Sequence, residues 1–110
     1  MSAFFESEII KEALDDINKL QEDVYGNLVQ FHMMTYDEQI DHVSKLTELL
    51  DKQRIMYTRL SLSDDPEAVV MKESLNKTVT MMGYPEGTDI AVLFKNMHAT
   101  IDALKEFLET

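Results

Sequence analysis

The chain has 110 residues, 45% of them hydrophobic, and its 21 acidic and 10 basic residues give a formal net charge of -11 at pH 7. This length fits one domain, 1–110, and the charge opposes direct binding to nucleic acid or to an anionic membrane, because both carry repelling phosphates. The lack of cysteine excludes disulfides, thiolate catalysis and cysteine zinc sites, and fits a cytoplasmic protein.

Apolar residues recur every three or four positions from Phe5 to Phe31, which predicts a first helix at about 4–31. Gly26 lies inside this segment and permits a kink or an early end there. A second helix is expected at about 36–62, because Thr35 stands three residues before Glu38, the spacing of a capping box. Its expected buried stripe alternates steps of three and four through Val43, Leu46, Leu50, Gln53, Tyr57 and Leu60.

Two shorter helices are expected after the break at Asp64-Asp65-Pro66, since aspartate is a good N-cap and proline suits the first helical position. The third helix runs to about residue 82, with Gly83 at a left-handed position just beyond its end. Its predicted apolar face holds Ala68, Met71, Leu75, Val79 and Met82.

A turn follows the third helix, and Thr88 is expected to cap a fourth helix at about 89–109. The predicted apolar face of that helix holds Ile90, Phe94, Met97, Ile101, Leu104 and Leu108. Because no segment alternates with period two, the predicted fold class is all-α: an elongated four-helix arrangement with two long and two shorter helices.

The length of the first two helices bears on assembly. A helix of some 27 residues is ~40 Å long, whereas a compact domain of this size has a radius of gyration near ~13 Å. Part of the apolar stripe of helices 4–31 and 36–62 therefore stays open to a second chain. We expect a homo-oligomer, most simply a dimer, with these helices in the interface.

Chemistry-bearing motifs are few. Glu38, Asp41 and His42 share one helical turn and form a weak candidate metal site, against the common alternative of a solvated helix face. No phosphate-binding glycine loop or nucleophile motif occurs, so we expect no catalytic residues, no cofactor and no enzyme activity.

Two groups of residues are candidates for an interaction face. The acidic group on the first helix is Asp15, Asp16, Glu22 and Asp23, for which a solvated surface is the simpler explanation. The apolar group, suited to an adaptable docking surface, is Met33, Met34, Met81, Met82 and Tyr84. For the methionines, the alternative is that they fill gaps in a small core. The second helix carries Lys45, Lys52 and Arg59 on one face, with Asp41 and Glu48 placed to pair with the two lysines.

Three segments carry a family resemblance: Phe4 to Ile10, Leu49 to Asp65, and Leu93 to Lys105. They resemble small all-helical proteins of unknown function found principally in cyanobacteria and in their phages. The sequence after Tyr25-Gly26 departs from that pattern, with Asn27 in place of an expected lysine, which favours a phage member acting in the host cytosol. The resemblance implies a biological setting and no catalytic residues.

Three functions follow as hypotheses. The first is a non-enzymatic protein–protein interaction or regulatory module that acts on a host protein or other cyanobacterial macromolecule. The second is an acidic nucleic-acid mimic that occupies a DNA-binding protein. The third is a small metal-dependent enzyme built on Glu38, Asp41 and His42.

Overall fold

A computed structural model describes residues 3–110, and this part of the chain contains helices and no strand. The elements are α1 (Ala3–Glu6), α2 (Glu8–Leu28), a 3₁₀ turn (Phe31–Met33), α3 (Tyr36–Leu62), α4 (Pro66–Met81) and α5 (Ile90–Glu109). The predicted all-α class is confirmed, and α3 has the predicted bounds 36–62, whereas α2, with 21 residues, is nearly the same length as α5, with 20.

The predicted first helix, 4–31, is wrong at both ends. Ser7 is extended, with φ -62° and ψ 132°, and divides α1 from α2. The Phe4 backbone N–H donates a hydrogen bond to Asp65 Oδ2 (3.1 Å), so a contact distant in sequence turns the chain out of the helix. At its C-terminal end, α2 stops at Leu28 and is followed by 3₁₀ hydrogen bonds. Gln39 Nε2 donates a hydrogen bond to the Phe31 carbonyl (2.9 Å) and so connects this turn to α3.

Local capping explains the helix starts. Thr35 Oγ1 accepts from the Glu38 N–H, and Glu38 Oε1 accepts from the Thr35 N–H, both at 3.2 Å, so the predicted capping box is confirmed. Asp65 Oδ1 accepts from the Glu67 N–H (3.0 Å) at the start of α4. Gly83, with φ +101°, occupies the predicted left-handed position after α4, which ends at Met81.

The cap of α5 is Asp89 and not the predicted Thr88. Asp89 Oδ1 accepts a hydrogen bond from the Ala91 N–H at 3.0 Å. Gly87 has φ +87°, and the Thr88 N–H bonds to the Pro85 carbonyl (3.1 Å), so the turn uses Thr88 and the helix begins one residue later, at Ile90. The sequence pattern predicted the region of the cap correctly, and the geometry of the turn determines that Asp89 is the capping residue.

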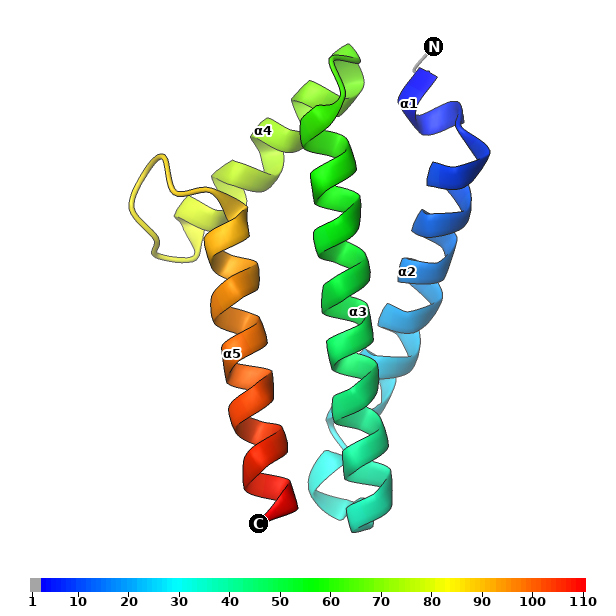
Figure 1. The fold of residues 1–110 in the computed structure, drawn as a ribbon, viewed down its shortest axis with the longest axis vertical. Helices are drawn as coiled ribbons and strands as arrows, with labels where there is room; N and C mark the ends of the chain where they lie inside the picture. Colours follow the sequence, from blue (N-terminus) through cyan, green and yellow to red (C-terminus); the bar gives the residue numbers. More distant parts are fainter. Residues whose placement is uncertain (1–2) are drawn as a thin grey trace.

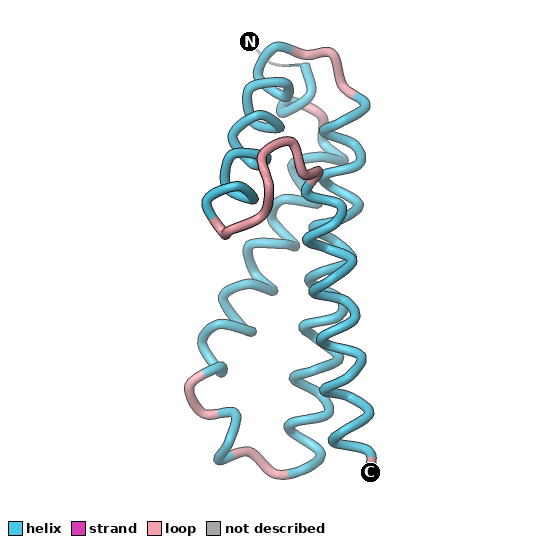
Figure 2. The backbone as a smooth tube through the Cα atoms, turned by 90° about the vertical axis from the view of Figure 1, so that its left-hand side faces the viewer, coloured by secondary structure: helices cyan, strands magenta, loops and turns pink. Residues whose placement is uncertain are grey.

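Helix α3 runs through the middle, with α2 along one flank and α5 along the other, while α4 crosses near one end to connect α3 to α5 (Figure 1). In the side view, α4 and the lower part of α2 lie on the same side of α3 and α5 (Figure 2). The principal extents are 47 × 34 × 19 Å, so the predicted elongated shape is confirmed.

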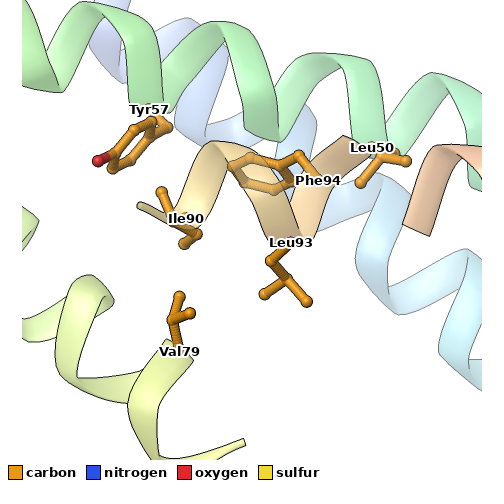
Figure 3. Close-up of a cluster of buried hydrophobic side chains, with 6 residues drawn as sticks. All are labelled: Leu50, Tyr57, Val79, Ile90, Leu93 and Phe94. Carbon is orange, nitrogen blue, oxygen red and sulfur yellow. The ribbon is translucent and has the colours of Figure 1, made fainter. Parts of the chain in front are cut away.

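Two hydrophobic clusters hold this arrangement. The larger joins α3, α4 and α5 through Leu50, Tyr57, Val79, Ile90, Leu93 and Phe94 (Figure 3). The smaller joins α2 to α3 through Ile17, Val24 and Leu49. The predicted stripe of α3 is confirmed, because it is buried at Val43, Leu50, Tyr57 and Leu60 and half-buried at Leu46 and Gln53.

The predicted apolar faces of the shorter helices are buried only in part. Ala68 and Val79 are fully buried, but Met71 is 44% exposed and Met82 is 57% exposed. On α5, Met97 is 40% exposed. The neighbouring helices therefore leave part of the apolar faces of α4 and α5 exposed.

Candidate protein interaction groove

The candidate metal residues do not form a metal site. Glu38 is engaged in the capping box, and Asp41 pairs with Lys45 Nζ at 3.4 Å. His42 does not lie on a solvated face, since it is 4% exposed and its ring lies 5.3 Å from that of Phe31. Within residues 3–110, no group of three or more histidine, aspartate and glutamate side chains is placed to hold a metal ion.

The acidic candidates on α2 face in different directions. Asp16 Oδ2 lies 3.8 Å from Lys52 Nζ, and Asp23 Oδ2 lies 2.9 Å from Lys45 Nζ. The hydrogen bond from Lys45 lowers the pKa of the Asp23 carboxyl from its ordinary value. Asp15 pairs with Lys19 on its own helix at 2.8 Å, and Glu22 is exposed.

Two of the four acids are therefore neutralised by the basic face of α3. The predicted local pair of Lys45 with Asp41 is confirmed, but the ion pair that the structure shows for Lys52 is with Asp16 of α2 and not with Glu48. The basic surface that an acidic first helix faces belongs, in part, to this same chain.

The methionine candidates lie in two separate places. Met33 and Met34 belong to the connection between α2 and α3, whereas Met81 and Met82 lie at the end of α4 (Figure 1). Met33, Met81 and Met82 are 78%, 86% and 57% exposed, so these three do not fill the core. Tyr84 is half-buried and packs against the larger hydrophobic cluster.

An apolar groove of about 480 Å³ opens between the helices. Four methionines line it, Met56, Met71, Met82 and Met97, and Met82 is the one that sequence analysis named as a docking residue. The remaining lining residues are Phe5, Leu14, Ile17, Tyr25, Gln53, Tyr57, Leu60, Leu75, Thr78, Ile90, Leu93 and Phe94. None of the sixteen is a lysine, arginine, aspartate, glutamate or histidine.

Most of this groove is not evident from the main apolar stripes of the sequence. Leu14 and Tyr25 lie beside the main apolar stripe of α2, at spacings of three and one from Ile17 and Val24. A second apolar line of this kind widens the nonpolar face of a helix beyond what one neighbouring helix covers. The wide apolar face of α2 is therefore the sequence feature that indicates contact with more than one other helix.

The sequence profile of a domain of unknown function, DUF1825, matches residues 2–108. The chain belongs to that family. No curated protein and no solved structure matches it. In the part of this DUF1825 chain that the structure describes, no helix combines the length and the apolar character needed to cross a membrane.

Behind the groove, one polar cluster joins three helices of the DUF1825 chain. The Tyr57 hydroxyl donates to Asp89 Oδ1 at 3.0 Å and lies 3.5 Å from Asn76 Oδ1. The bond from the Ala91 N–H holds the pKa of the Asp89 carboxyl below its ordinary value, and the bond from Tyr57 acts in the same direction. Burial raises the pKa of the Tyr57 hydroxyl. The cluster fixes α5 against α3 at one wall of the groove.

We expect Tyr57→Phe to lower the free energy of unfolding by about 1 kcal/mol at neutral pH, because Asp89 loses a hydrogen bond. Since the folded-state pKa of Asp89 is depressed, its contribution is complete above the unfolded-state pKa and is lost as the pH falls through the folded-state value. The difference between wild type and variant should therefore stay constant above about pH 4 and shrink as the pH falls further. Urea unfolding at fixed protein concentration measures it.

The matched control is Tyr36→Phe, because Tyr36 is 54% exposed. We expect this control to change the free energy of unfolding by less than about 0.5 kcal/mol. A Tyr57→Phe deficit that stays constant down to about pH 3 would contradict the role of Asp89 and assign the hydroxyl to Asn76.

Proposed function

We propose that the protein is a non-enzymatic protein–protein interaction module that binds a host protein through the apolar groove. The observation that carries the proposal is the groove itself: sixteen uncharged lining residues in a chain of which 28% is charged. Concave, mostly apolar clefts with few polar groups are typical of binding sites.

The groove suits a helical element of a partner. Amphipathic helices bind by laying an apolar face into a hydrophobic groove, with anchor side chains one helical turn apart. Methionine thioethers are flexible and adapt to irregular apolar surfaces, and Met71, Met82 and Met97 are accessible at 40–57%. The partner contact is therefore expected to be mainly apolar and weakly dependent on salt.

The setting comes from the resemblance to cyanobacterial and cyanophage proteins, so the partner is sought in the cytoplasm of a cyanobacterial cell. A nucleic-acid mimic is the second candidate function, favoured by the net charge of -11. The pairing of Asp16 and Asp23 with Lys52 and Lys45 removes two acids of α2 from that role. The two candidates differ in salt dependence, since charge-based complexes weaken at high ionic strength.

The test is affinity capture from cyanobacterial lysate, with immobilised wild type, Met82→Glu and Met81→Glu compared at low and at high salt. Met82 lines the groove, whereas its neighbour Met81 lies outside it and is 86% exposed. We expect the same host protein on wild type and on Met81→Glu at both salt concentrations. Capture by Met82→Glu should fall by at least about tenfold, because the variant places a carboxylate in an apolar contact.

Equal capture by Met82→Glu overturns the groove as the binding site. Capture that every variant loses at high salt supports the nucleic-acid mimic instead. A transition metal retained by the purified protein and lost in His42→Ala would overturn the non-enzymatic assignment.

A further inference from the structure

The single chain has more accessible surface than its mass predicts. A compact monomer of 12.7 kDa exposes ~6,200 Å², whereas this chain exposes 7583 Å². Its radius of gyration is 15.8 Å, against ~13 Å for a compact domain of this length. The excess of roughly 1,300 Å² shows that the chain is more extended than a compact monomer of its mass and leaves surface that a second molecule can cover.

That surface includes the groove. Tyr25 on α2, Met71 and Met82 at α4, and Met97 on α5 are 58%, 44%, 57% and 40% exposed and all line it. In Figure 2, α4 at one end and the lower part of α2 toward the other end lie on the same side of α3 and α5, and the four residues belong to the helices that border this side or, for Met82, to the end of α4. The exposed side chains leave apolar surface in the groove accessible to another molecule.

The distribution of charged residues indicates which kind of molecule covers the groove. A basic partner would be complementary to acids around the groove, but the lining holds no charged residue although the chain carries 21 acids. Two copies of a chain with a net charge of -11 repel each other, so they associate through a face that brings no carboxylates together. The groove face meets that condition, because each copy presents an uncharged apolar surface to the other.

We infer that a second copy of this chain covers the groove in the isolated protein and forms a two-fold symmetric dimer. A dimer that brought each chain back to the surface area of a compact monomer would bury roughly 1,300 Å² on each copy, or about 2,600 Å² for the pair, within the range that obligate homodimers bury. Two-fold symmetry places the same residues on both sides of the interface. The inference rests on the proposed function in one respect: the second copy and the host protein occupy the same groove, so a host protein that binds there displaces the second copy.

Sedimentation of the purified protein from ~1 µM to ~100 µM tests the dimer. We expect wild type to sediment as two chains of 12.7 kDa and Met97→Glu as one. The control is Val92→Glu on the same helix, because Val92 is 43% exposed, close to the 40% of Met97, but does not line the groove. The variant Met97→Glu should weaken dimerisation by about a hundredfold and Val92→Glu by less than about threefold.

Salt dependence gives a second readout. Raising the salt concentration from about 50 mM to about 500 mM should tighten the dimer severalfold, because screening reduces the repulsion between two acidic chains. A dimer that dissociates as salt rises is held by charged contacts, which overturns the groove as its interface.

Single cysteines provide a test that does not depend on a disruptive variant, because the chain has no cysteine of its own. Met82→Cys and Met81→Cys are labelled with a charged thiol reagent over the same concentration range. We expect the labelling of Met82→Cys to slow by at least about tenfold as the dimer forms, and that of Met81→Cys to stay within about twofold.

A wild-type chain that is monomeric at ~100 µM, a dimeric Met97→Glu, or an unprotected Met82→Cys overturns the inference. Other results distinguish the failure of this dimer from the failure of the proposed host binding. A monomeric wild type whose captured host protein protects Met82→Cys refutes the second copy and supports host binding. A dimer whose groove variants capture host protein as well as wild type supports the second copy and refutes host binding at the groove.

Discussion

Phe94→Ala is expected to lower the free energy of unfolding by about 3–5 kcal/mol, a large fraction of the stability of a domain of this size. Phe94 is 9% exposed and lies at the centre of the cluster that joins α3, α4 and α5 (Figure 3). Its ring centroid lies 6.2 Å from that of Tyr57, with the rings tilted by 59°. Removing the ring leaves a cavity among the side chains of α3, α4 and α5 that pack in this cluster.

Thermal unfolding followed by far-UV circular dichroism measures this effect, and a fall in Tm of roughly 15 °C or more is expected. The matched control is Phe107→Ala on the same helix, since Phe107 is 75% exposed. Its Tm should change by no more than about 3 °C. Similar losses for both variants would contradict the placement of Phe94 in the core.

His42→Leu is expected to raise the free energy of unfolding by about 1–2 kcal/mol. His42 is 4% exposed, and among the described residues its buried Nε2 atom has no hydrogen-bond partner. Burying an unpaired polar atom costs free energy, while a leucine of similar size keeps the apolar contact with Phe31. The gain should be seen in urea unfolding at neutral pH.

The control for this variant is His32→Leu, because His32 is exposed in the 3₁₀ turn only ten residues away. It should leave the free energy of unfolding within about 0.5 kcal/mol of wild type. A loss of stability in His42→Leu would contradict the assignment, since it would show that the imidazole makes a favourable polar contact.

Helix starts that depend on neighbouring residues are predictable from the sequence. The Thr35 and Glu38 capping box and the Asp65-Pro66 pair each satisfy backbone N–H groups within three residues, so no distant contact is needed to define them. The left-handed position of Gly83 follows from the same local reasoning.

The errors come from contacts between distant residues. The break at Ser7 accompanies a hydrogen bond from Phe4 to Asp65, sixty-one residues away, which no periodicity contains. The end of α2 at Leu28 depends on Gln39 of the next helix, which holds the Phe31 carbonyl. The helical spacing of apolar residues continues past Ser7 and past Leu28, but contacts with distant residues interrupt the helix at both positions.

The candidate site shows the same division. The sequence left two interpretations open for Met33, Met34, Met81 and Met82, a docking surface or gap-filling in the core, and of the four only Met82 lines the groove. Helical spacing predicted Met71 and Met97 as core residues, and they line the open wall instead. Spacing identifies the apolar face of a helix but not whether another helix covers it.

The sequence by itself determined the helical class, the bounds of α3, the acidic charge and the lack of a catalytic motif, because each follows from composition or from contacts within a few residues. Only the tertiary structure decided which faces meet. It turned the acids Asp16 and Asp23 toward Lys52 and Lys45 of α3, and it left the apolar faces of α2, α4 and α5 around an open groove. The physical reason is that pairing between helices depends on the turns that orient them, and those turns are stabilised by residues far apart in the chain.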